Sequence, residues 1–485
     1  MMNTNNPNLD LFIKTVRQIN KEDLEYYLEK SWEYDKLKTM AIIFNSRDRI
    51  NGKKEKMISN YSMLWLKKNH NNIYKKNIIN YINNYGCWND LNFIIKINKK
   101  NSYEYKLFAE QLKKDLEILN HNNDNNDNND NNEIKHKNIS LCSKWVISPN
   151  HKDVIKIARY LFNNDLKNYQ ERYRKDIIKP LRTHLELLES KLCSKNYETI
   201  DYKKIPAKAL SMYVKTFKKN DNEKYQNYLN DVKNNKVSMK ITGLLPHEII
   251  KKYLQNNLNV IDETLELQWK TFVDNFKNEN YENYEDIIPI VDVSGSMFAG
   301  EGNNNIKPIF VSVALGLFLS ELNRNELHNK IITFSESPRF LEIKGNNLRD
   351  RIKSILDAPF GLNTNFLRIA DLIINNSLYS KKIICFTDMQ FDKSYNECNF
   401  TSLEDIHNSF MDKFTNNNYE KPLLIYWNLN GSYNECPINT ELENTSIISG
   451  FSEQLLKVVI KSNDISPLNL MEEIIKPYYN NIILI

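Results

Sequence analysis

The spacing of apolar residues divides the chain into two parts with different periodicity. From residue 9 to 115, and again from 139 to 275, apolar positions recur at intervals of three and four residues, as in amphipathic helices. One such run, 60–85, is followed by Gly86 and by a second run from Trp88, which is typical of a helical hairpin. We therefore predict an all-α, helical-repeat N-terminal part.

From residue 286 the pattern changes to short apolar runs that alternate with helical ones. The short runs predict strands at 287–293, 330–334, 340–343, 382–387 and 422–428, with 340–343 as an edge strand. Helices are expected at 306–322, 348–356, 365–378, 402–414 and 452–460. The first of these helices is apolar nearly all round, as expected for a helix packed against a sheet. This alternation predicts a doubly wound, mostly parallel α/β sheet covered on both faces.

The predicted organisation is α-helical at 1–117 and at 139–285 and α/β at 286–485. Between the helical regions, residues 118–138 contain an Asn-Asn-Asp repeat with almost no apolar residue to bury. Such a segment predicts a disordered insert on the surface. Its aspartates do not predict a calcium loop, because the glycine and the terminal glutamate of such loops are missing.

Charge is distributed unevenly between the two parts. Residues 1–285 hold 49 Lys and Arg against 37 Asp and Glu, whereas residues 286–485 hold 17 against 24. The basic part could bind phosphates or acidic protein, or its lysines could simply be solvated. Tyrosine and phenylalanine lie among its basic residues, as in proteins that bind single-stranded nucleic acid, but helical spacing favours core positions for Tyr169, Tyr173, Tyr213 and Phe217.

The sequence predicts a soluble, intracellular protein of the cytoplasm that does not enter a membrane. The six cysteines have neither zinc-finger nor disulfide-framework spacing, which fits a reducing compartment. The first residues lack an apolar signal core, and the longest apolar run, 311–319, is far too short to span a bilayer.

Three polar turns follow or precede elements of the predicted sheet. Asp292-x-Ser294-x-Ser296 ends the first strand, Thr364 lies in a turn before a helix, and Asp388 follows strand 382–387. Because the carboxyl ends of parallel strands meet at one edge, we expect these side chains to converge. Carboxylate and hydroxyl oxygens suit a hard cation such as Mg²⁺. Gly295 is expected to let the first turn close without a Cβ clash.

The set Asp292, Ser294, Ser296, Thr364 and Asp388 resembles the metal-ion-dependent adhesion site (MIDAS) of von Willebrand factor type A domains. This resemblance implies a Rossmann-like type A domain at 286–485. It also implies that the serines and the threonine bind Mg²⁺ (or Mn²⁺ or Ca²⁺) directly, and the aspartates directly or through water. A carboxylate from an acidic protein or peptide partner would then complete the metal shell.

Motifs along most of the chain are also similar to an uncharacterised family found in plants, fungi and large DNA viruses. They include Tyr85-Gly86-x-Trp88-x-Asp90-Leu91, Pro246-His247-Glu248-Ile249 and Thr387-Asp388-Met389-Gln390-Phe391-Asp392. A viral member would occupy the host cytoplasm. Helical repeats followed by a type A domain also resemble the layout of Ro ribonucleoprotein (TROVE) proteins, which implies RNA as the alternative partner of the basic helices.

The sequence favours a binding protein over an enzyme. It contains no phosphate-binding Walker A motif and no dinucleotide fingerprint. The C-terminal part has two histidines, His328 and His407, and spacing ties neither to the serines of the first turn, so we do not predict a catalytic triad. A metal-assisted phosphohydrolase that uses Asp292, Asp388 and Asp392 is the enzymatic alternative. We predict a non-enzymatic, cation-dependent binding protein.

Overall fold

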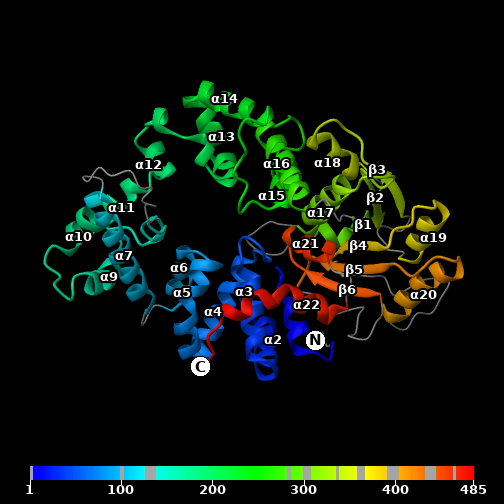
Figure 1. Ribbon diagram of the computed structural model, residues 1–485, viewed down its shortest axis with the longest axis horizontal. Helices are drawn as coiled ribbons and strands as arrows, with labels where there is room; N and C mark the ends of the chain where they lie inside the picture. Colours follow the sequence, from blue (N-terminus) through cyan, green and yellow to red (C-terminus); the bar gives the residue numbers. More distant parts are fainter. Residues whose placement is uncertain are drawn as a thin grey trace. The chain divides into compact units, whose positions relative to one another are not determined.

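The amphipathic spacing of the first part produces short helices in the computed structural model of the chain. The structure describes residues 4–98, 103–125, 138–280, 286–298, 307–334, 338–357, 366–389, 403–431, 444–461 and 466–484. The chain forms two compact units, residues 1–73 with 203–485 and residues 74–202 (Figure 1). The sequence-based boundary at residue 286 follows the change in element type, whereas this division groups the first helices with the sheet.

The first helices follow the predicted periodicity with one difference. Their bounds are α1 (Pro7–Lys14), α2 (Lys21–Tyr34), α3 (Lys36–Arg47), α4 (Lys56–Asn69) and α5 (Asn71–Asn84). The expected continuous run 60–85 is therefore two helices, interrupted at His70. The ring of His70 stacks on Trp32 at a centroid distance of 4.2 Å and packs edge-on against Trp65 at 5.3 Å. These contacts fix His70 between the two helices. The apolar spacing continues across His70, so it did not predict the interruption.

The described residues of unit 74–202 are helical and irregular. The elements are α6 (Trp88–Ile97), α7 (Tyr103–Asn125), α8 (Cys142–Trp145), α9 (Val154–Leu161), α10 (Tyr169–Arg172), the π-helical η1 (Tyr173–Ile178), α11 (Lys179–His184), α12 (Leu188–Cys193) and η2 (Tyr197–Thr199). The π-helical turn precedes Pro180, where proline removes a backbone donor from the helical ladder. Helix α7 extends into the predicted insert, and residues 126–137 lie outside the described residues.

The remaining helices of unit 1 precede, follow or separate the strands. Before the sheet come η3 (Tyr202–Lys204), α13 (Ala207–Asn220), α14 (Asn222–Lys233), α15 (Pro246–Gln255) and α16 (Glu263–Asn280). Between and after the strands come η4 (Gly295–Phe298), α17 (Pro308–Leu322), α18 (Leu348–Leu356), α19 (Leu367–Asn375), α20 (Leu403–Asn416), α21 (Gln454–Lys461), α22 (Pro467–Ile475) and η5 (Lys476–Asn481). Within the described ranges, no helix is both long enough and apolar enough to cross a bilayer.

The described strands form one mixed six-stranded sheet in the order β3-β2-β1-β4-β5-β6. The strands are β1 (Ile287–Asp292), β2 (Lys330–Phe334), β3 (Arg339–Glu342), β4 (Lys382–Thr387), β5 (Leu423–Asn428) and β6 (Thr445–Ser449). All neighbours pair in parallel except β2 and β3, which are antiparallel. The five predicted strands are therefore confirmed, including the edge strand β3. Strand β6 and helix α22 were not predicted.

Helix α17 covers one face of the sheet. Val291 of β1 and Phe386 of β4 are in register and point to this face. A Cβ added to Gly316 of α17 would lie 2.2 Å from Cγ2 of Val291, so glycine permits the close approach of helix and strand. Nearly every residue of α17 is buried, which confirms the prediction from its uniform apolarity.

Helices α19 and α20 cover the opposite face. Tyr426 of β5 is in register with Cys385, and Trp427 with Phe386, so Tyr426 points away from α17. Its ring stacks on Phe366, which precedes α19, at a centroid distance of 5.8 Å. Coverage of both faces is thus confirmed.

Helix α1 packs against the carboxyl end of β6, far away in sequence. Ser449 Oγ donates to the carbonyl of Phe12 over 3.1 Å. The fully buried Lys53 Nζ donates to the same carbonyl, to Thr15 Oγ1 at 2.9 Å and to Ser449 Oγ at 2.7 Å. All three ammonium protons therefore have acceptors, and the lysine ties the first helix to the last strand.

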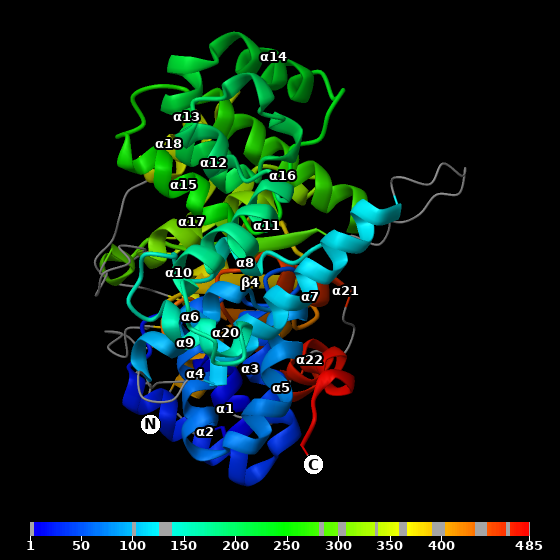
Figure 2. The ribbon, with the colours of Figure 1, turned by 90° about the vertical axis from the view of Figure 1, so that its left-hand side faces the viewer.

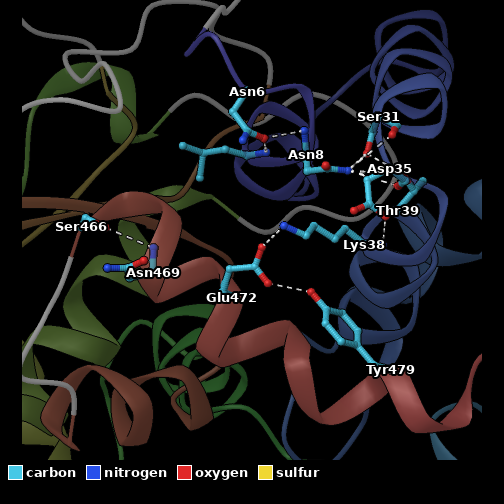
Figure 3. Close-up of polar contacts among 11 residues, drawn as sticks. Asn6, Asn8, Ser31, Asp35, Lys38, Thr39, Ser466, Asn469, Glu472 and Tyr479 are labelled. Atoms are coloured by element: carbon cyan, nitrogen blue, oxygen red, sulfur yellow. Dashed lines mark hydrogen bonds and ion pairs between the residues drawn. The ribbon is translucent and has the colours of Figure 1, made fainter.

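Helix α22 also lies beside α1 and α3, as both ribbon views show (Figure 1, Figure 2). Glu472 of α22 forms an ion pair with Lys38 of α3 and accepts a 2.7 Å hydrogen bond from Tyr479 (Figure 3). In the same view, Asn8 Nδ2 donates to Ser31 Oγ at 2.7 Å and joins α1 to α2. Helices from both ends of the chain thus share one polar network.

Candidate metal centre

The predicted site lies where the sheet changes its direction of winding. From β1 the chain continues through β2 and β3 on one side, and through β4, β5 and β6 on the other. Strands β1 and β4 are direct neighbours with parallel carboxyl ends. Ligands of doubly wound sheets bind in the crevice at such a switch point. Asp292 ends β1 and Asp388 follows β4, so the fold brings both residues to this position.

The turn after β1 brings its three predicted oxygen donors together. Asp292 is 0% exposed and accepts a 2.9 Å hydrogen bond from the backbone N–H of Ser294 through Oδ1. The hydroxyls of Ser294 and Ser296 share a hydrogen bond of 3.0 Å. The reason expected for Gly295 is wrong, because a Cβ there would meet no described heavy atom within 4 Å and its φ is not left-handed.

The end of β4 carries a second carboxylate and a hydroxyl that was not predicted. Asp388 is 0% exposed. Before it, Thr387 Oγ1 donates to Asp292 Oδ2 over 2.6 Å and accepts the N–H of Met389 over 3.1 Å. The sequence alone does not reveal this contact, because it depends on the register of the sheet: Thr387 lies two residues after Cys385, which pairs with Ile290 of β1.

The two carboxylates interact electrostatically. Burial raises the pKa of Asp292 to about 7, and the nearby carboxylate of Asp388 adds to this effect, while the bonds from Thr387 and Ser294 oppose it. Two buried like charges are unfavourable in each other's presence, and a divalent cation would relieve that repulsion.

The donor set fits a hard divalent cation, because it consists of carboxylate and hydroxyl oxygens without sulfur or imidazole. Among the described residues, no three His, Cys, Asp or Glu side chains are grouped as a metal site. The proposed centre has only two carboxylates, and its other donors are hydroxyls, so it would not form such a group of three. Thr364, the fifth predicted donor, lies outside the described residues.

Comparison with known proteins identifies the family. The domain of unknown function DUF2828 matches residues 1–106 and 104–281. The chain belongs to the DUF2828 family. Residues 286–476 match a second domain of unknown function, DUF7788. The uncharacterized protein L728 of Acanthamoeba polyphaga mimivirus is 30% identical over 513 residues, which cover 98% of this chain and 85% of that protein. The predicted membership of an uncharacterised family with viral members is confirmed.

Among solved structures, the Ro (RSR) protein of Deinococcus radiodurans is a distant neighbour of this DUF2828 chain. The superposition covers 96% of this chain and 99% of the Ro chain, with 11% sequence identity and a TM-score of 0.36. Similarity at this level is too low to support an argument about the fold or about RNA.

The two histidines of the α/β part of the DUF2828 chain contact groups other than the serines of the site. His407 is 1% exposed, and its ring nitrogens contact Thr445 Oγ1 at 2.7 Å and the Tyr426 hydroxyl at 3.4 Å. The Nδ1 atom of His328 lies 2.7 Å from the carbonyl of Asn323. Asp392, named for the phosphohydrolase alternative, lies outside the described residues.

Of the four aromatic residues named among the basic helices of the DUF2828 chain, two are core residues. Tyr173 and Phe217 are fully buried, which confirms that interpretation for both. Tyr169 and Tyr213 are half-buried. Stacking of bases on these rings therefore has no support from their exposure, and the exposed lysines remain the basis for an RNA interaction.

Proposed function

We propose that the α/β part is a von Willebrand factor type A-like module that binds a divalent cation and, through it, an acidic protein or peptide. The donors would be Asp292, Ser294, Ser296, Thr364 and Asp388, and the preferred cation Mg²⁺, with Mn²⁺ or Ca²⁺ as substitutes. The observation that carries this proposal is the burial of Asp292 and Asp388, in electrostatic contact, beside serine hydroxyls at the switch point of the sheet.

The residues of the site have separate roles in this proposal. Asp292 and Asp388 supply the negative charge, and the serine hydroxyls supply neutral oxygens, so only some of the donors are charged. When bound, the cation supplies an electrophilic centre that a carboxylate of the partner can complete. The chain's own residues do no covalent chemistry, and the module is non-enzymatic.

The test is the effect of Mg²⁺ on stability and on peptide binding. For the full-length protein, Mg²⁺ at a hundred times its Kd should raise the free energy of unfolding by about 2.7 kcal/mol. Asp292→Asn should abolish this gain, because it removes one of the two carboxylates that would hold the cation. Asp357→Asn, at an exposed position in the same unit, is the matched control.

The partner is tested with a fluorescent, glutamate-rich synthetic peptide. The fluorescence anisotropy of the peptide should rise when wild-type protein is added in the presence of Mg²⁺. It should return to the value of the free peptide when the cation is chelated, and it should not rise when Asp292→Asn is added instead. Wild-type protein that shows neither stabilisation nor peptide binding at millimolar Mg²⁺ would refute the proposal. Metal binding without peptide binding would retain the cation site and reject the acidic partner.

RNA on the basic helices is the alternative, favoured by the exposed lysines of α13. Lys215, Lys218 and Lys219 all lie at the solvent surface. If they contact phosphates, affinity for a single-stranded RNA should fall steeply between about 50 and 200 mM salt. An RNA affinity that does not change over this range of salt would exclude binding of phosphates by these lysines.

A further inference from the structure

One buried hydroxyl connects the two turns that carry the carboxylates of the proposed cation site. Thr387 Oγ1 lies 2.6 Å from Asp292 Oδ2 and 3.1 Å from the backbone nitrogen of Met389. A backbone N–H can only donate, so the hydroxyl accepts from Met389 and its own proton goes to Asp292. One side chain thus orients the carboxylate at the end of β1 and closes the turn after β4.

The strand register places Thr387 where it can do this. Ile290 of β1 pairs with Cys385 of β4, and two residues further along each strand the side chains return to the same face. Asp292 and Thr387 therefore point to the same side of the sheet. The backbone of Thr387 is fixed independently, because its carbonyl accepts the N–H of Leu429 over 2.9 Å.

The same hydroxyl holds an unusual backbone conformation beside Asp388. Met389 has φ of 66°, in the left-handed region that non-glycine residues seldom adopt. The bond from its N–H to Thr387 closes the turn around Asp388, which lies between the two residues. The direction of the Asp388 carboxylate therefore depends on this turn.

The carboxylate of Asp292 keeps capacity for a cation while it is held. Oδ1 accepts from the N–H of Ser294 and Oδ2 accepts from Thr387, so each oxygen has one hydrogen-bond donor. A carboxylate oxygen has room for a further interaction beside one donor. Two donors from different elements fix the rotation of the carboxylate, as partners of metal-binding carboxylates do.

We infer that Thr387 is a positioning residue of the cation site, whose hydroxyl fixes the carboxylates of Asp292 and Asp388 relative to each other. This inference rests on the proposed function. It assigns to Thr387 no contact with the cation, but it makes the affinity of the site depend on a hydroxyl at this position. A methyl group of the same shape should not replace it.

The test compares Thr387→Val, which keeps the shape, with Thr387→Ser, which keeps the hydroxyl. In the full-length protein, calorimetric titration with Mg²⁺ should give a Kd for Thr387→Val about 10 to 100 times that of the wild type, the usual loss when a partner of a metal ligand is removed. Thr387→Ser should bind within about threefold of the wild type, since the hydroxyl is retained. Urea unfolding without Mg²⁺ shows whether each variant is folded.

The outcomes separate this inference from the proposed function. If the wild type binds no Mg²⁺, the proposed function fails and the inference with it. If the wild type binds and Thr387→Val binds equally well, only the inference fails. If Thr387→Val does not fold, the inference is tested on Thr387→Ser alone. A loss of Mg²⁺ affinity in Thr387→Ser as large as that in Asp292→Asn would show that the hydroxyl is not what the site requires.

Discussion

The buried histidine of α20 predicts a measurable loss of stability in mild acid. His407 is 1% exposed and contacts Thr445 and Tyr426 through its two ring nitrogens. Burial lowers its pKa to about 4, and the positive charge of Lys421 contributes in the same direction. The unfolded chain, with a histidine pKa of about 6.5, therefore takes up a proton at a higher pH than the folded one. The contribution of neutral His407 to the free energy of unfolding is therefore fully present above about pH 6.5 and is lost as the pH falls towards 4.

The size of the effect follows from the two pKa values. At pH 5 the unfolded state is almost fully protonated at His407, whereas the folded state is mostly neutral. The difference in proton binding lowers the free energy of unfolding by about 2 kcal/mol relative to pH 7. A loss of that size is a large fraction of the stability of an ordinary domain.

Urea unfolding, followed by tryptophan fluorescence, should be measured at pH 7 and pH 5 for the wild type and for His407→Gln. The variant is expected to be less stable at pH 7, and the gap should narrow by about 2 kcal/mol at pH 5, because glutamine does not titrate. His247, which is also buried with a lowered pKa, is present in both proteins and cancels in the comparison. Equal losses for the two proteins between pH 7 and pH 5 would refute the reasoning.

Two further substitutions test how α17 is packed. Gly316→Ala places a Cβ about 2.2 Å from Cγ2 of Val291 and should cost roughly 1–3 kcal/mol in urea unfolding. Because Val291→Ala alone removes buried methyl groups, the clash is tested by the cost of Gly316→Ala in the Val291→Ala background, which should be smaller than in the wild type; equal costs would contradict the clash. Glu321→Ala leaves the Trp269 indole N–H, which lies 3.1 Å from the carboxylate, without its acceptor. It also removes the carboxylate partner of the Arg351 guanidinium, which keeps its bond to the Gly345 carbonyl, so the change should cost about 2 kcal/mol. Glu321→Gln keeps an acceptor for the indole and should cost clearly less; equal losses would contradict this account.

Local patterns predicted the sheet well where the strands are apolar. Strands β2 and β4 begin and end at the residues expected from their apolar runs. Strand β6 was missed because three of its five residues are Thr or Ser. Their polarity is compatible with burial only through distant partners, as when His407 contacts Thr445 and when Lys53 and Phe12 contact Ser449. No local periodicity contains that information.

The candidate site shows the same limit. The turn with Asp292, Ser294 and Ser296 is local, so its spacing predicted that the three would lie together. Asp388 followed from the position of a strand end. Thr387 was missed because a threonine at the end of a strand is common, and only the register of β1 against β4 shows which carboxylate it faces. Thr364 stays a prediction.

The packing of α1 against the sheet has a consequence for the order of events during synthesis. The boundary between the two family matches, at residues 281 and 286, lies inside one compact unit. Lys14 must find the carbonyl of Gly431, 417 residues later in the chain. At ribosomal rates of about 5–20 residues per second, the first helix waits roughly 20 to 80 seconds for that partner to be made. During this interval α2 and α3, which also pack against α1, are already made, but the part of α1 that packs against β6 and α22 has no native partner. The unfinished unit therefore leaves apolar surface of α1 exposed, and such surface makes a nascent chain prone to aggregation.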